Sequence, residues 1–228
     1  MADAGDAGAI GGAPAAARAP VRRWAELAAM FVAGPAAYAV ADPGPGWLFP
    51  ALWAWAAACL WLLLRDPTFD RRQLWNARNA LRVGGRVVAV FVPLGAGIAL
   101  AVAALDEDAL FSLPRRRPEL WAAIMLLYPL LSVYPQEVIF RVFFFHRYGA
   151  LFGRQGVVVV ASAAAFGLAH VVFHNWIAVA MTFIGGLLFA ATYTRTRSAF
   201  AVSVEHALYG CLVFTIGLGQ YFYSGRAG

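Results

Sequence analysis

The amino-acid sequence predicts an all-α membrane protein, a polytopic transmembrane helix bundle of about seven spans. Of the 228 residues, 62% are hydrophobic and only 13% are charged, whereas soluble domains carry about 25% charged residues. The mean hydropathy is +0.67. The apolar residues also fall into runs close to the roughly 20 residues that a helix needs to cross the hydrocarbon core of a bilayer.

The N-terminal segment differs in composition from the rest of the chain. Residues 1–20 are rich in Ala, Gly and Pro, and we expect them to form a disordered tail because they cannot bury a core. The transmembrane domain is therefore placed at 21–228. Its first apolar run, 24–41, ends in Ala39-Val40-Ala41, which has the small-residue pattern of a signal-peptide cleavage site. We favour a retained span, because Glu26 interrupts the start of the run, and keep a cleaved signal as the alternative.

Six further spans follow, separated by turn residues and charged loops. Asp42-Pro43-Gly44-Pro45-Gly46 forms a turn cluster after the first span. Pro129 and Pro135 lie inside one later span and predict a kink just before Glu137. The predicted spans are 47–64, 83–104, 119–145, 156–173, 177–193 and 199–218.

The arginines between the spans predict the orientation in the membrane. Cytoplasmic loops carry an excess of basic residues, and all 18 basic residues of this chain are arginine. The bias favours a cytoplasmic N-terminus and an external C-terminus, and the Arg-rich and Ala-rich composition indicates a bacterial plasma membrane. The net charge of +6 follows from these loops, so we expect no nucleic-acid partner. On the cytoplasmic side would lie Arg18, Arg22, Arg23, Arg65, Arg71, Arg72, Arg78, Arg82, Arg147, Arg154, Arg195 and Arg197, and on the other side Arg115, Arg116, Arg117 and Arg226.

A carboxylate and a guanidinium stand four residues apart inside span 119–145. Positions i and i+4 of a helix share a face, so Glu137 and Arg141 are expected to contact each other. Charged groups are rare in the hydrocarbon core and usually face the interior of a bundle. The pair has two interpretations, a structural ion pair that ties two helices together or one half of an active site.

Two histidines on other spans favour the second interpretation. His170 ends span 156–173, and His206 lies within span 199–218. Ionisable groups on three helices, with few other polar residues in the spans, point to one shared polar site rather than to isolated core histidines. A carboxylate and an imidazole that flank one water can act as a general-base pair for hydrolysis. A second imidazole can donate a hydrogen bond to the oxyanion of a tetrahedral intermediate.

The sequence does not demand a cofactor. His170 and His174 are four residues apart, which is a spacing that metal ligands on a helix can have, but His174 lies at a predicted span end. Cys59 and Cys211 lie in separate apolar runs without metal-binding spacing. We therefore expect no cofactor, with zinc as an alternative that is not favoured.

Three short motifs occur in a fixed order along these spans. They are Gln136-Glu137-Val138-Ile139-Phe140-Arg141, Phe166-Gly167-Leu168-Ala169-His170 and His206-Ala207-Leu208-Tyr209-Gly210. Their order and spacing resemble the CAAX prenyl endopeptidase and bacteriocin-processing (CPBP, or Abi) family of intramembrane proteases. That family is marked by Glu/Gln-Glu-x-x-x-Arg, Phe-x-x-x-His and His-x-x-x-Asn. The resemblance covers about residues 120–215, a CAAX-protease-like core.

The resemblance implies an all-helical membrane domain around a conical cavity. It also implies that a Glu/His-activated water hydrolyses a peptide bond of a membrane-associated protein or peptide substrate, while a His and an Asn hold the oxyanion. As catalytic residues it suggests Glu137, His170 and His206, with Gln136 and Arg141 in support. The expected activity is that of a glutamate-type endopeptidase without zinc.

Two positions depart from the family pattern. Gln136 replaces the glutamate that the family uses as its base, and an amide cannot take up a proton. Gly210 replaces the asparagine and offers no side-chain donor. Either Glu137, or Glu205 beside His206, replaces the base, or the protein is a non-catalytic scaffold or partner-binding member. A transporter with a buried proton relay is the remaining alternative, but the sequence shows no internal repeat that would support it.

Overall fold

The computed structural model describes residues 15–222, and within this range helix is the regular secondary structure. Six described helices are long and apolar enough to cross a membrane, and a seventh apolar helix, α11 (Ala199–Thr215), is shorter. The predicted helical membrane bundle is therefore confirmed. The expected N-terminal tail lies outside the described residues over 1–14, and helix α1 already begins at Ala15.

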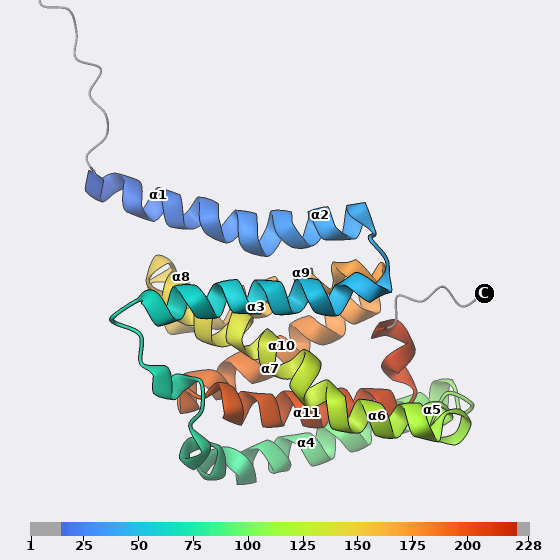
Figure 1. The fold of residues 1–228 in the computed structure, drawn as a ribbon. Coiled ribbons are helices and arrows are strands. Elements are labelled where there is room, and N and C mark those ends of the chain that lie inside the picture. The colour runs from blue at the N-terminus through green and yellow to red at the C-terminus, as the bar shows by residue number, and fades with distance from the viewer. Residues whose placement is uncertain (1–14, 223–228) are drawn as a thin grey trace, which may run out of the picture.

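The N-terminal spans run back and forth along the bundle (Figure 1). The first consists of α1 (Ala15–Ala28), a π-helical turn (Ala29–Ala33) and α2 (Gly34–Ala41), and it ends at Asp42, which has a left-handed φ of 38°. A 3-10 turn (Pro45–Trp47) then leads into α3 (Leu48–Arg65). After a short 3-10 turn (Arg71–Gln73), α4 (Ala77–Leu105) forms the third span, and α5 (Ser112–Arg116) follows it.

One long helical run passes through the middle of the bundle (Figure 1). It consists of α6 (Pro118–Tyr128), a π-helical stretch (Pro129–Val133), α7 (Tyr134–Glu137), a second π-helical stretch (Val138–Phe143) and α8 (Phe144–Phe152). The first π-helical stretch begins at Pro129, in the region where the prolines predict a kink. Residues 135–145 are all buried, so the run carries the site residues through the core. π-Bulges are rare and frequently occur at functional sites.

The last three spans enclose the other side of the core. They are α9 (Gln155–Ala169) with a 3-10 turn (His170–Phe173), α10 (Trp176–Thr196), and α11 with a 3-10 turn (Leu218–Phe222). Small residues bring α9 and α10 close together, because a Cβ added at Gly186 would lie 3.0 Å from Ala163 Cα. Such small-residue contacts are typical of packed membrane helices.

Polar contacts between loops and helix ends gather at one end of the bundle. Arg147 binds the two carboxylate oxygens of Glu26 at 2.9 Å each, and His146 Nε2 lies 2.9 Å from Asp66 Oδ2. Hydrogen bonds from Thr68 and His146 lower the pKa of the Asp66 carboxyl. These contacts join segments on which the sequence analysis placed the cytoplasmic arginines. Two further links at this end are Tyr193 to Gln73 and Ser198 to the carbonyl of Asn76.

Candidate active site

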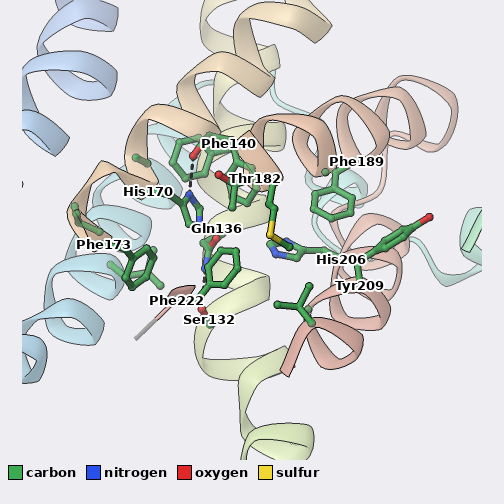
Figure 2. A pocket seen from close by; sticks show the side chains of 18 of the residues that line it. Ser132, Gln136, Phe140, His170, Phe173, Thr182, Phe189, His206, Tyr209 and Phe222 are labelled. Carbon is green, nitrogen blue, oxygen red and sulfur yellow. Dashed lines mark hydrogen bonds between the residues drawn. The ribbon is translucent and has the colours of Figure 1, made fainter. Parts of the chain in front are cut away.

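A cavity of about 800 Å³ lies between the helices, in the half of the bundle away from these loop contacts. It extends to Tyr38 at the end of α2, Leu48 at the start of α3, and Phe173 and Phe222 in the 3-10 turns. Its lining is mostly apolar (Figure 2). The polar lining residues are Tyr38, Tyr128, Ser132, Gln136, His170, Thr182, His206 and Tyr209.

One face of the central helical run supplies a stripe of lining residues at intervals of four. They are Tyr128, Ser132, Gln136 and Phe140. Gln136 Nε2 donates a hydrogen bond to Ser132 Oγ at 2.7 Å (Figure 2). Its Oε1 is buried and has no hydrogen-bond partner among residues 15–222. Gln136, and not the neighbouring Glu137, faces the cavity.

Glu137 lies behind this wall and is fully buried. Its Oε1 is 2.7 Å from His206 Nδ1, and its Oε2 is 3.2 Å from Arg141 Nε. The predicted contact between Glu137 and Arg141 is therefore confirmed. It is a charge contact, because the two atoms lack hydrogen-bond geometry. The carboxylate thus connects the central run to α11 without lining the cavity.

Arg141 is also fully buried and ties α9 to the central run. Its Nη1 donates to Ser162 Oγ at 3.1 Å, and the Ser162 hydroxyl donates to the carbonyl oxygen of Phe140 at 2.7 Å. The guanidinium carbon lies 4.8 Å from the centre of the Phe166 ring, which adds a cation–π attraction. The pair is therefore a structural ion pair, because Arg141 joins two helices and balances the charge of Glu137. It is also adjacent to the candidate site, because Glu137 contacts His206, which lines the cavity.

His206 is held from both ring nitrogens. A carboxylate can only accept, so Nδ1 carries a proton and donates it to Glu137. In the neutral ring Nε2 is then an acceptor, and it lies 3.2 Å from the hydroxyl of Tyr128, which donates to it. The Phe189 ring stacks on the imidazole at 4.5 Å. The side chain is thus fixed in one orientation and one tautomer, with Nε2 as its acceptor.

His170 presents a second acceptor to the same cavity. Its Nδ1 lies 2.7 Å from the carbonyl oxygen of Phe166, so Nδ1 donates and Nε2 accepts (Figure 2). The ring contacts Phe166 and, from the C-terminal 3-10 turn, Phe222. The structure therefore brings His170 and His206 to one cavity, as the sequence analysis expected, but Glu137 contacts only the second of them.

Glu205, the other carboxylate considered as a base, does not line the cavity. It is buried and hydrogen bonds to Thr192. Its Oε2 has no partner in the described chain. Among the described residues, then, no carboxylate lines the cavity.

Metal-binding geometry is not found in residues 15–222, which contain no group of three or more His, Cys, Asp or Glu side chains able to hold an ion. His174 is exposed, with a left-handed φ of 56°, and it does not line the cavity. The described cysteines, Cys59 and Cys211, are both free.

Tyr128 is the site residue that the sequence analysis missed. It precedes Gln136 by two intervals of four residues, so the rule that paired Glu137 with Arg141 would have placed it on the same helix face as Gln136, two turns away. Its direct contact is with His206, on a helix distant in the sequence. No spacing within one helix could have indicated that contact.

Comparison with known families agrees with the motifs. Residues 118–212 match the family described as type II CAAX prenyl endopeptidase Rce1-like. No curated protein and no solved structure matches the chain. The matched segment begins with α6, ends within α11 and contains Glu137, His170 and His206. Over this segment the chain is similar to the type II CAAX prenyl endopeptidase Rce1-like family.

Proposed function

We propose that the protein is an intramembrane endopeptidase that hydrolyses a peptide bond of a membrane-associated protein or peptide inside this cavity. The observation that carries the proposal is the 2.7 Å hydrogen bond between the buried Glu137 carboxylate and His206, which lines the cavity. A carboxylate behind a histidine fixes its tautomer and stabilises the imidazolium, so that the other ring nitrogen can act as a base.

The proposed reaction uses His206 twice. Its Nε2 takes a proton from water as the water oxygen attacks the carbonyl carbon of the substrate. It then returns this proton to the amide nitrogen as the carbon–nitrogen bond breaks, which gives a free carboxylic acid and a free amine. Glu137 stays ionised throughout. His170, whose Nε2 is a free acceptor, helps to hold the attacking water.

The lining of the cavity supports a substrate that carries an apolar group. Most lining residues are apolar, and burial of apolar surface is the main favourable term for such ligands. The side chains of Gln136 and Ser132, which line the same cavity, offer polar groups to a peptide backbone. A peptide with an attached lipid combines both features.

The test is hydrolysis of a farnesylated peptide ending in a CAAX sequence by the purified protein in liposomes. We expect the wild type to cleave it and His206→Ala to lose roughly 10²–10⁴-fold in kcat, the range for a general base. The matched control is His174→Ala, because His174 is exposed and outside the cavity. The proposal is wrong if the wild type cleaves neither this peptide nor the same peptide carrying a palmitoyl chain.

A second candidate function is binding without cleavage. One observation favours it. Of the neighbours Gln136 and Glu137, the residue that lines the cavity is Gln136, whose amide cannot act as a base. Such a protein would hold a membrane-associated peptide or partner in the cavity and leave its backbone intact.

Gln136→Glu separates the two functions. If Glu137 and His206 form the base, the wild type already cleaves the farnesylated peptide, and we expect the substitution to change kcat by less than about 10²-fold, the lower end of a general-base contribution. Fragment masses and initial rates for both proteins provide the measurement. Cleavage by Gln136→Glu alone would instead support a wild type that binds without cleaving.

We propose that the N-terminus faces the cytoplasm of a bacterial cell, because the segments with most loop arginines meet at one end of the bundle. The cavity then lies in the outer half of the membrane.

Single cysteines test this orientation after replacement of Cys59 and Cys211 by Ala. An impermeant maleimide is expected to label Glu107→Cys in intact cells and Arg72→Cys only after permeabilisation, since both side chains are exposed at opposite ends of the bundle. The reverse pattern would put the N-terminus and the arginine-rich loops outside.

A further inference from the structure

The hydroxyl of Tyr128 lies 3.2 Å from His206 Nε2, and Tyr128 lines the cavity. We infer that Tyr128 is a further catalytic residue, whose hydroxyl donates a hydrogen bond to the carbonyl oxygen of the scissile bond as negative charge develops there. The inference rests on the proposed hydrolysis. That reaction requires a hydrogen-bond donor to the oxyanion, and Tyr128 would supply it.

The need follows from the tautomers of the two histidines. A tetrahedral intermediate requires a hydrogen-bond donor beside its oxygen. The Nδ1 proton of His206 is used by Glu137, and that of His170 is used by the carbonyl of Phe166. In their neutral forms both rings therefore present only lone pairs to the cavity. The proton that His206 later gains goes to the leaving amine, so neither imidazole is free to hold the oxyanion.

The Tyr128 hydroxyl suits this task because it can change partners. In the structure it donates to His206 Nε2. When a substrate carbonyl enters, the hydroxyl hydrogen can turn about the Cζ–Oη bond toward the carbonyl oxygen. The same movement uncovers the Nε2 lone pair for the attacking water, so substrate binding provides the donor and exposes the base together.

The missing side chain at Gly210 makes room for this ring. A Cβ built at Gly210 would lie 2.6 Å from Tyr128 Cζ and closer still to the Tyr128 Cε1 and hydroxyl. Gly210 follows His206 by one turn of α11, while Tyr128 comes from the end of α6. The ring also packs edge-on against Phe214, with centroids 5.5 Å apart. Gly210 therefore allows the phenol to reach His206 across the helix interface.

Tyr128→Phe tests the hydroxyl while keeping the ring. With the farnesylated peptide, kcat should fall by about 10²–10³-fold, the usual loss for one oxyanion donor, with KM close to the wild-type value. The matched control is Tyr134→Phe, which removes a hydroxyl that donates to the carbonyl of Leu74 on the same helical run but outside the cavity. It should keep the wild-type kcat. A wild-type kcat in Tyr128→Phe overturns the inference.

A binding measurement separates this inference from the proposed function. A peptide phosphinate of the probe sequence carries charged oxygens on a tetrahedral centre, whereas the matching ketomethylene peptide carries a planar carbonyl. Tyr128→Phe should weaken phosphinate binding at least about tenfold and leave ketomethylene binding unchanged. If the two proteins bind the phosphinate equally, Tyr128 is not the donor. A wild type that does not turn over rejects the proposed function, whatever the phosphinate result.

Discussion

Glu137→Gln is expected to lower kcat for peptide hydrolysis by roughly 10³–10⁴-fold, which is the scale of losing the carboxylate behind a catalytic histidine. The substitution preserves the size of the side chain and an acceptor toward Arg141, so we expect a folded protein of reduced stability. Because Glu137 does not line the cavity, KM should stay near the wild-type value. Initial rates with the farnesylated peptide across a range of peptide concentrations measure both constants.

The physical reason is the tautomer of His206. An amide at position 137 has one acceptor group, the oxygen, and one donor group, the N–H₂. The guanidinium of Arg141 lies 3.2 Å from Oε2 of Glu137, so the amide oxygen is expected to face Arg141. The amide N–H₂ then faces His206 Nδ1, which must become the acceptor. The ring proton moves to Nε2, and the base facing the cavity is lost.

Glu119→Gln is the matched control for this substitution. Glu119 lies in the first turn of α6 and is exposed, so its loss removes one carboxylate from the same helical run without touching the site. It should keep the wild-type kcat. If Glu137→Gln and Glu119→Gln hydrolyse the peptide equally fast, the Glu137–His206 pair is not the base.

Arg141→Met is expected to lower the free energy of unfolding by about 3–5 kcal/mol, the typical cost of removing one partner from a buried ion pair. The substitution leaves the fully buried Glu137 carboxylate without its cation. It also removes the donor to Ser162 and the contact with the Phe166 ring. Denaturant unfolding in mixed micelles, followed by helical circular dichroism, measures the change.

Two further variants test whether the unpaired charge of Glu137 causes the loss of stability in Arg141→Met. Arg154→Met removes an exposed arginine just before α9 and should change stability by no more than about 0.5 kcal/mol, as surface substitutions usually do. Glu137→Gln combined with Arg141→Met removes both charges and should recover part of the stability lost by Arg141→Met alone. A double variant no more stable than Arg141→Met would attribute the loss to packing instead.

The contact between Glu137 and Arg141 was predictable because it depends only on helix geometry. The meeting of three helices was predictable for a related reason, since a bilayer drives ionisable groups such as Glu137, His170 and His206 toward the interior of the bundle. The predicted resemblance to the family was confirmed over residues 118–212. Its motifs lie inside helices of the expected order, which made the fold class accessible from the sequence.

The division of roles between Gln136 and Glu137 could not be predicted. Neighbouring residues on a helix point about 100° apart, so a small rotation decides which of them lines the cavity. Two π-helical stretches, at Pro129–Val133 and Val138–Phe143, flank these residues and depart from the regular α-helical rotation. In a span that is apolar on every side, hydrophobic periodicity gives no guide to it. The contact of Tyr128 with His206 could not be predicted because it joins two helices that are distant in the sequence.

The central claim is that Glu137 and His206 activate water for peptide hydrolysis in the cavity. The most direct measurement is cleavage of the farnesylated peptide in ¹⁸O-labelled water, with the fragment masses compared for the wild type and Glu137→Gln. We predict that the wild type places one ¹⁸O in the new carboxylate, while Glu137→Gln leaves the peptide intact over the same time. An intact peptide with the wild type, or equal labelling by both proteins, would contradict the account.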